Sequence, residues 1–212
     1  MPSKIRLRYI FRPFIKSMAK NLSKLGVTAN IATTIMLVFA LLSFALLVLF
    51  NNPLFFGIAI FLVGIFDGID GAIARITNTT SKKGTFLDST MDRFSEFIIF
   101  LAILIYCWDQ LLWNTINMNL VVFISSFTSI MISYIRARAE NEFMGDFDFG
   151  LMARSERLFY LVITSIIDFF FGFFNELLFI FMWLVVGTAL YRYAKIKEHI
   201  KEKERKTVET KF

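Results

Sequence analysis

Long apolar stretches alternate with short polar connections along this chain of 212 residues. Six stretches are long enough, or nearly so, to cross a hydrocarbon core, which takes about 20 helical residues. They are Ile31–Phe50, Pro53–Phe66 with a helical continuation to Arg75, Thr85–Trp108, Asn119–Tyr134 with a continuation to Glu140, Leu158–Phe171 and Asn175–Tyr193. Asp168 interrupts the fifth stretch, so the pattern defines its bounds least well, and we assign Asp168 no role. The pattern predicts an all-α integral membrane protein with six transmembrane helices.

The basic residues support this layout because they fall only in alternate connections. All 23 Lys and Arg lie in four segments, which are the residues before 25, 75–93, 136–157 and the residues after 191. The connections between these segments, 51–52, 109–118 and 172–176, contain none. Since an excess of Lys and Arg marks the cytoplasmic side of a membrane protein, we expect a multi-pass protein of the cell membrane with both termini in the cytoplasm.

Composition narrows the chemistry further. With 57% hydrophobic residues, the chain is interpreted as one membrane domain over residues 1–212. One Cys and one His exclude a disulfide within the chain and a zinc site built on those ligands. The net charge is +6, and the basic residues border the predicted spans instead of forming one stripe. This arrangement fits binding to anionic lipid head groups and not to nucleic acid.

The two ends of the chain differ from the spans. Residues 1–25 alternate basic and bulky apolar positions, which predicts an amphipathic helix in the cytoplasmic interface. A positively charged orientation signal explains the same pattern. Residues 194–212 mix charges of both signs at helical spacing, which indicates a solvated helical tail in the cytoplasm.

Four carboxylates stand at the expected cytoplasmic ends of the second and third spans. Asp67 and Asp70 are three residues apart and Asp88 and Asp92 are four apart, so each pair lies on one face of its helix. The short connection 76–83 makes the two helices antiparallel neighbours, which brings the acidic faces together. Four carboxylates in one site repel unless cations neutralise them, and oxygen ligands suit Mg²⁺, Mn²⁺ or Ca²⁺. Paired ions of this kind typically serve phosphoryl transfer.

Small residues surround the first acidic pair. Gly64, Gly68 and Gly71 leave the polar end of the second span nearly bare, so that a phosphorylated group could approach its backbone. Close packing of a neighbouring helix is the alternative explanation for Gly64 and Gly68.

The acidic residues belong to a longer pattern. Over 26 residues the chain reads D-x2-D-G-x2-A-R-x8-G-x3-D-x3-D, from Asp67 to Asp92, with Gly71, Arg75 and Gly84 among the fixed positions. This pattern resembles the signature of the CDP-alcohol phosphatidyltransferase family at every fixed position. The six-span layout with cytoplasmic termini is also similar to that family over nearly the whole chain. The resemblance implies an enzyme of phospholipid biosynthesis that works at the cytoplasmic face of the membrane and forms a homodimer.

The resemblance also implies roles for the aspartates. Asp67, Asp70, Asp88 and Asp92 would hold two Mg²⁺ or Mn²⁺ ions on the diphosphate of a CDP-lipid. Asp92 would also be the general base that takes the proton of the acceptor hydroxyl.

Other residues are implied for binding the CDP-lipid, which is CDP-diacylglycerol or CDP-archaeol. They are Asn30, Thr33, Gly71, Arg75 and Ser81. Asn30 and Thr33 correspond to a family segment T-P-N-x-x-T, in which this chain has Ala29 in place of Pro.

Arginines in the second half of the chain bear on the acceptor. Arg136, Arg138, Arg154 and Arg157 flank the connection between the fourth and fifth spans. Arginines gathered near a metal site favour a dianionic acceptor, because the guanidinium fork matches phosphate. Positive-inside topology also accounts for basic residues at these ends.

The segments around these arginines, S-Y-x-R-A-R-A-E and E-R, resemble the inositol-phosphate branch of the family. That branch makes phosphatidylinositol phosphate or archaetidylinositol phosphate. By this resemblance the residues that bind the acceptor phosphate would be Ser133, Arg136, Arg154, Arg157 and Arg192.

We therefore expect a transferase that moves a phosphatidyl group, on diacylglycerol or archaeol, from a CDP-lipid to a hydroxyl of inositol 1-phosphate and releases CMP. Glycerol 3-phosphate is the alternative acceptor, since it also presents a phosphate to arginine. A cation transporter is an alternative of another class, but it needs carboxylates near the membrane centre and these stand at one end. Glu96, one helical turn beyond Asp92, either orients a ligand or makes a polar contact inside the bundle.

Overall fold

Seven helices make up most of the part of the chain that the structure describes. The computed structural model describes residues 7–143 and 147–209. The helices are α1 (Leu7–Lys24), α2 (Ala29–Val48), α3 (Pro53–Ile76), α4 (Lys82–Tyr106), α5 (Met118–Glu142), α6 (Arg154–Phe171) and α7 (Phe174–Glu209). A short antiparallel pair, β1 (Leu111–Leu112) and β2 (Ile116–Asn117), connects α4 to α5. Residues 1–6 of the predicted interfacial helix and 210–212 of the predicted tail lie outside the described residues.

Polar caps fix where the long helices begin. The side chains of Thr28, Asn52 and Ser81 each accept a hydrogen bond from the backbone N–H three residues on, at 3.3, 3.1 and 3.0 Å. Such caps satisfy N–H groups that have no partner inside the helix. Pro53 stands in the first turn of α3, where its missing N–H costs nothing. At the other end of a helix, Gly172 stops α6 with a φ of 72°, a left-handed conformation that glycine adopts without strain.

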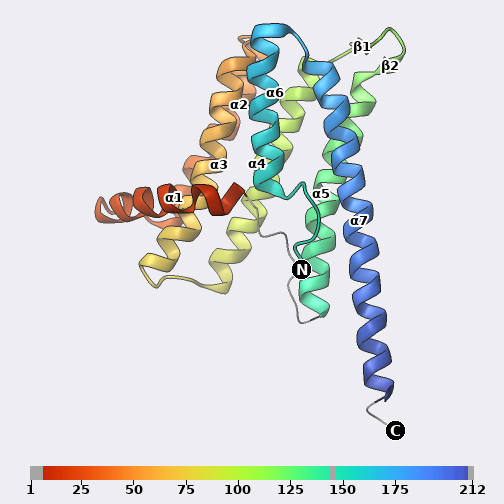
Figure 1. Ribbon diagram of the computed structural model, residues 1–212. Coiled ribbons are helices and arrows are strands. Elements are labelled where there is room, and N and C mark those ends of the chain that lie inside the picture. The colour runs from red at the N-terminus through yellow and green to blue at the C-terminus, as the bar shows by residue number, and fades with distance from the viewer. Residues whose placement is uncertain (1–6, 144–146, 210–212) are drawn as a thin grey trace.

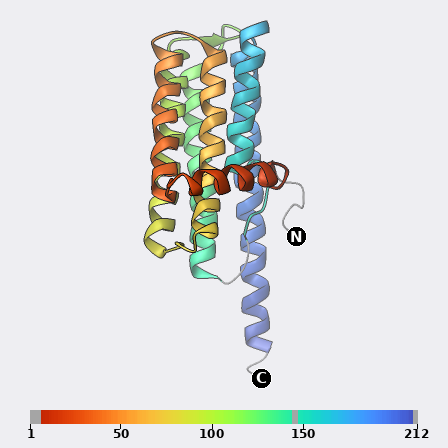
Figure 2. The ribbon, with the colours of Figure 1, turned by 90° about the vertical axis from the view of Figure 1, so that its left-hand side faces the viewer.

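The helices α2 to α7 run up and down in one bundle (Figures 1 and 2). Helix α2 packs against α3 and α4, α3 packs against α6, and α5 packs against α7. The shared core is apolar and includes the fully buried Met36, Phe56, Ile60, Ile103 and Phe181. The prediction of an all-α protein is confirmed.

Four helices in the described part of the chain are long and apolar enough to cross a membrane. They are α2, α3, α5 and the part of α7 that ends at Lys201. Helices α4 and α6 lie in the same bundle but carry charged residues within their apolar stretches, with Asp88, Asp92 and Glu96 in α4 and Arg154 and Arg157 in α6. The structure therefore fits a multi-pass membrane protein.

Helix α1 lies across the bundle instead of along it (Figures 1 and 2). It packs on α3 through Ile15, Met18 and Ala19. A Cβ atom on Gly68 would lie 2.7 Å from Cδ1 of Ile15, so the glycine is what lets α1 approach this closely. Helix α1, the α3–α4 connection and the last turns of α7 all lie toward one end of the bundle, and β1 and β2 lie at the other (Figure 1).

We predict that Gly57→Ala destabilises the bundle. A Cβ atom at Gly57 would lie 2.8 Å from Cβ of Ser165, so α3 and α6 must move apart to admit it. Overpacking of this kind costs about 1–3 kcal/mol, which should lower the midpoint of thermal unfolding in detergent. Gly187→Ala is the matched control, because a Cβ there meets nothing within 4 Å. Equal midpoints for the two variants would contradict the close packing of α3 on α6.

Candidate active site

Three carboxylates converge at the end of the bundle that carries α1. Carboxylate oxygens of Asp67 on α3 and of Asp88 and Asp92 on α4 all lie within 4.8 Å of one another. Asp88 and Asp92 share a helix face because they are one turn apart, and the short α3–α4 connection turns that face toward Asp67. The convergence predicted from the spacing of the acidic residues is therefore present for three of the four.

Asp70 stands beside this group and is held by protein groups. Its Oδ2 accepts a hydrogen bond from Oγ1 of Thr33 at 2.8 Å, and its Oδ1 accepts one from the backbone N–H of Gly71 at 2.5 Å. Only 3% of Asp70 is exposed. It still interacts electrostatically with Asp67 and Asp88, so it belongs to the same acidic cluster. Thr33, predicted to lie near a nucleotide, thus fixes the orientation of one carboxylate.

The donor set fits a divalent cation. Oδ1 of Asp88 is buried and has no hydrogen-bond partner among the described residues, which is costly for a carboxylate unless a cation binds it. All of the converging ligand atoms are carboxylate oxygens, the hard donors that Mg²⁺ and Mn²⁺ prefer. The residues present can therefore hold a metal of the kind that the sequence predicts.

Arg154 connects the carboxylates to α6. Its Nη1 lies 2.7 Å from Oδ1 of Asp92 and also pairs with Asp67. Its Nη2 donates to Oγ of Ser95 at 2.8 Å. Only 11% of the Arg154 side chain is exposed, so this guanidinium contributes positive charge directly inside the acidic cluster. The sequence predicted Arg154 near the metal site, but it did not indicate Ser95.

Arg157, one turn further along α6, is buried in a pair with Glu96. Nε and Nη2 of Arg157 donate to the two carboxylate oxygens of Glu96 at 2.7 and 3.0 Å, and 1% of each residue is exposed. Arg157 also reaches Oγ of Ser133 at 3.3 Å and the carbonyl oxygen of Met152 at 3.0 Å. Of the two sequence interpretations of Glu96, the structure therefore supports the polar contact inside the bundle.

Arg192 on α7 is equally enclosed. Its guanidinium donates to the carbonyl oxygens of Phe149 at 2.7 Å and Ile132 at 2.9 Å, and it pairs with Asp148 at 3.2 Å. Asp148 also lies 3.6 Å from Nη1 of Arg136, a side chain that is 34% exposed. Arg192 and Asp148 thus tie the α5–α6 connection to α5 and α7. The sequence did not indicate Asp148, because its partners are far from it along the chain.

The remaining residues predicted to bind the CDP-lipid lie at the ends of α2, α3 and α4. Arg75 is exposed on the last turn of α3 and covers Gly71, where an added Cβ would lie 3.4 Å from Nη1 of the arginine. Asn30 is exposed in the first turn of α2. Ser81 caps α4, as described above, and is exposed.

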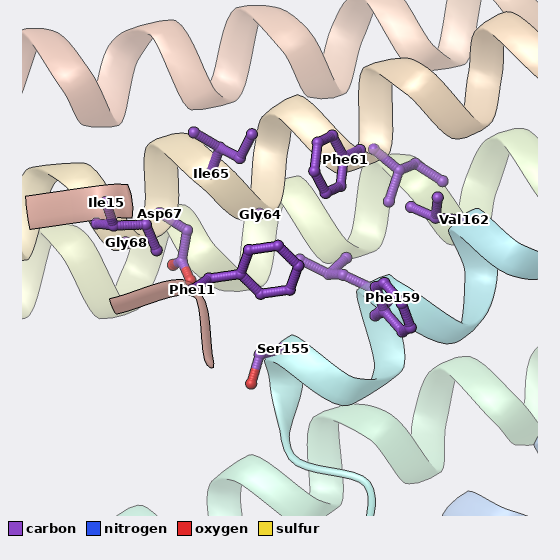
Figure 3. A pocket seen from close by; sticks show the side chains of 12 residues that line it. Phe11, Ile15, Phe61, Gly64, Ile65, Asp67, Gly68, Ser155, Phe159 and Val162 are labelled. Atoms are coloured by element: carbon purple, nitrogen blue, oxygen red, sulfur yellow. The ribbon is translucent and has the colours of Figure 1, made fainter. Parts of the chain in front are cut away.

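An apolar pocket between α1, α3 and α6 reaches the acidic cluster (Figure 3). Asp67 and Gly68 lie toward one end, and Phe61 and Val162 lie toward the other. The ring of Phe11 from α1 is 6.2 Å from that of Phe61, and it also contacts the ring of Phe159 on α6. The sequence did not predict this pocket, because it forms only when α1 lies across α3 and α6.

Comparison with known proteins identifies the class to which this site belongs. The sequence model of the CDP-alcohol phosphatidyltransferase family matches residues 26–191. The archaetidylinositol phosphate synthase of Pyrococcus horikoshii is 34% identical over 171 residues, which are 79% of this chain and 84% of that protein. The chain belongs to the CDP-alcohol phosphatidyltransferase family. It is therefore a transferase of phospholipid synthesis, as the signature from Asp67 to Asp92 predicted.

Solved structures agree with this assignment at the level of the fold. The phosphatidylinositol phosphate synthase of Mycobacterium tuberculosis with CDP-DAG bound has a TM-score of 0.73 and 24% identity, and the match covers 86% of this chain and 92% of that one. The same enzyme in complex with manganese and citrate has a TM-score of 0.74 and 23% identity, with coverage of 86% and 88%.

We predict that Glu96→Leu destabilises the protein strongly and that the double variant Glu96→Leu/Arg157→Leu recovers most of the loss. Removal of one partner leaves a buried charge uncompensated, which costs about 3–5 kcal/mol, whereas replacing both partners with apolar side chains is often neutral. Thermal unfolding in detergent would measure both effects. A double variant no more stable than the single variant would argue against the buried pair.

Proposed function

We propose that this enzyme transfers a lipid phosphatidyl group from a CDP-lipid to a hydroxyl of inositol 1-phosphate and releases CMP. The observation that carries the proposal is the position of Asp67. This residue lines the apolar pocket, belongs to the carboxylate group and pairs with Arg154. One side chain thus joins a surface for lipid, a metal-binding group and a cation for an anionic acceptor.

We propose that all six helices of the bundle cross the membrane and that α1 lies in the cytoplasmic interface. Helices α4 and α6 pack against helices that qualify as spans, which supports a crossing for them too. Helix α1 lies across the bundle, as expected for a helix in the membrane plane (Figure 2). Residues 1–212 then form one membrane domain with both termini and the active site at the cytoplasmic side, and residues 194–212 form the tail. A homodimer, implied by the family resemblance, stays a prediction.

The carboxylates are proposed to bind two divalent ions, Mg²⁺ or Mn²⁺. Asp67, Asp70, Asp88 and Asp92 supply the oxygen ligands. When bound, the ions would neutralise the donor diphosphate and stabilise the charge that develops as CMP leaves. Thr33 keeps Asp70 oriented through its hydrogen bond of 2.8 Å. The family resemblance also implies that Thr33 lies near the nucleotide, and we propose this as a second role.

The donor is proposed to bind with its lipid chains in the apolar pocket and its head group over the end of α3. The pocket opens along α3 and α6 and ends at Asp67 (Figure 3). A donor whose lipid chain lies in this pocket would therefore have its phosphates next to the carboxylates. Gly71 and Arg75 lie on the same helix about one and two turns further on, and Asn30 and Ser81 are exposed at the starts of α2 and α4. Both CDP-diacylglycerol and CDP-archaeol present this head group.

The acceptor phosphate is proposed to bind at the arginines of α5 and α6. Arg136 and Arg154 have exposed surface, and they are proposed to contact the phosphate directly. Ser133, Arg157 and Arg192 complete the predicted set, with Arg157 and Arg192 in buried positions and Ser133 half-buried. The name of the Pyrococcus horikoshii relative supports an inositol phosphate as the acceptor. Glycerol 3-phosphate remains the alternative because its phosphate would use the same arginines.

Asp92, Arg154 and Ser95 have separate proposed roles in the reaction. The acceptor oxygen attacks the lipid-side phosphorus, the bond to the CMP oxygen breaks, and Asp92 takes the proton of the acceptor hydroxyl. Nη1 of Arg154 lies 2.7 Å from Oδ1 of Asp92, so an acceptor phosphate bound to Arg154 lies close to this base. Ser95 restrains Arg154 by accepting a hydrogen bond at 2.8 Å.

We predict that the purified protein with Mg²⁺ and a CDP-lipid releases CMP with inositol 1-phosphate and not with free inositol or serine. Asp92→Asn should lower the rate by about 10²–10⁴-fold, the usual contribution of a general base. Asp168→Asn is the matched control, because Asp168 lies at the opposite end of α6 near Tyr106. Release with glycerol 3-phosphate alone would overturn the acceptor, and no release with any acceptor from either donor lipid would overturn the proposed function.

A second prediction concerns the donor pocket. Gly64→Leu should raise the KM for the CDP-lipid roughly tenfold, a change of about 1.4 kcal/mol, because the new side chain fills the pocket. Gly64→Ala should leave it unchanged, since a Cβ there lies 3.9 Å from Cδ1 of Leu158. The KM for the acceptor should stay constant in both variants. A donor KM that is unaffected by leucine would show that the lipid binds elsewhere.

A further inference from the structure

Arg93 follows Asp92 on α4 and has no part in the residue roles described so far. Its side chain is 37% exposed, but Nη1 is buried and has no hydrogen-bond partner among the described residues. The nearest carboxylate oxygen to this atom in an ion pair is Oε2 of Glu96 at 3.7 Å. That oxygen is already bound by Arg157 at 3.0 Å. Arg93 therefore presents an unsatisfied donor in a polar, partly open place.

Arg93 lies among charged groups of both signs that already have partners. Arg93 interacts electrostatically with Arg154 and Arg157 as well as with Asp92 and Glu96. Arg157 and Glu96 neutralise one another in their two-point pair. Arg154 is likewise paired, with Asp67 and Asp92. Arg93 is left with the 3.7 Å contact to Glu96 and with repulsion from Arg154 and Arg157, and a bound anion would offset that repulsion.

Membrane orientation does not require an arginine at this position. Lys82 and Lys83 in the first turn of α4 already supply basic residues at the start of the helix. Arg93 stands nearly three turns further in, where burying part of a guanidinium is costly. A ligand that forms hydrogen bonds with it would offset that cost, and the planar fork of arginine suits a phosphate group.

We propose that Arg93 binds the phosphate of the acceptor together with Arg154. The inference rests on the proposed function and extends it, because it makes Arg93 a determinant of specificity for phosphorylated over unphosphorylated alcohols. The neighbours of Arg93 favour the acceptor over the donor diphosphate, since they are the arginines of α6 and not Arg75. Its place beside Asp92 brings the acceptor phosphate to the residue proposed as the base.

The test is a kinetic comparison of Arg93→Gln and Arg93→Lys with the wild-type enzyme. For Arg93→Gln we expect the KM for the phosphorylated acceptor to rise at least tenfold, with kcat within threefold of wild type and the KM for the CDP-lipid unchanged. For Arg93→Lys we expect a KM for the phosphorylated acceptor between those of the wild type and Arg93→Gln, because lysine keeps the positive charge but lacks the forked donors of the guanidinium. Arg138→Gln is the matched control, since Arg138 is 60% exposed and pairs with Glu142 on the surface of α5.

A direct binding measurement keeps this inference separate from the identity of the acceptor. Titration calorimetry with inorganic phosphate and Mn²⁺-loaded protein should give a dissociation constant at least tenfold higher for Arg93→Gln than for wild type and for Arg138→Gln. If the wild type used no phosphorylated acceptor, the proposed function would fail, and the phosphate titration would still decide the role of Arg93. Equal phosphate affinities, a higher KM for the CDP-lipid alone, or weaker Mn²⁺ binding in Arg93→Gln and Arg93→Lys would each overturn the assignment.

Discussion

Repulsion among carboxylates is the constraint on which the rest of this structure depends. Asp67, Asp88 and Asp92 place their oxygens within 4.8 Å of one another at the end of a helix bundle that is otherwise apolar. Charged groups in such surroundings are stable only when cations offset them. Arg154 supplies one positive charge by direct contact, and its hydrogen bond to Ser95 holds it there. The remaining negative charge is what makes this end of the bundle suited to divalent ions.

The surroundings of the carboxylates follow from the same arrangement. Helix α1 lies across α3 and α6, and the rings of Phe11 and Phe159 help to enclose an apolar pocket that ends at Asp67. Helix α6 also contributes Arg154, which contacts Asp67 and Asp92. Under the proposed function, the pocket and Arg154 bring a lipid-linked diphosphate and an anionic acceptor to the same carboxylates.

Regular spacing made much of this predictable from the sequence. The apolar stretches predicted the long helices of the bundle to within a few residues, and the i, i+3 and i, i+4 aspartates predicted the convergence of two acidic helix faces. The signature from Asp67 to Asp92 predicted the family, because its residues lie close together in the chain. Helix bounds were less certain where polar residues begin a helix, as at Arg154, which starts α6 four residues before the predicted span.

Contacts between distant segments account for what the sequence did not predict. The partners Glu96 and Arg157 are 61 residues apart, and Asp148 and Arg192 are 44 apart, so no local pattern distinguishes these buried pairs from phosphate-binding arginines. Gly68 could have served a ligand or a helix, and in the structure it lies against Ile15 of α1 and also lines the apolar pocket. The pocket likewise depends on where α1 lies.

The most direct test of the account is a titration of the purified protein with Mn²⁺, followed by electron paramagnetic resonance. The account predicts two ions bound per chain, with a spectrum that shows magnetic coupling between them, and loss of at least one ion in Asp67→Asn. Binding of no ion, or of ions that Asp67→Asn leaves unchanged, would contradict the claim that the converging carboxylates are a metal centre.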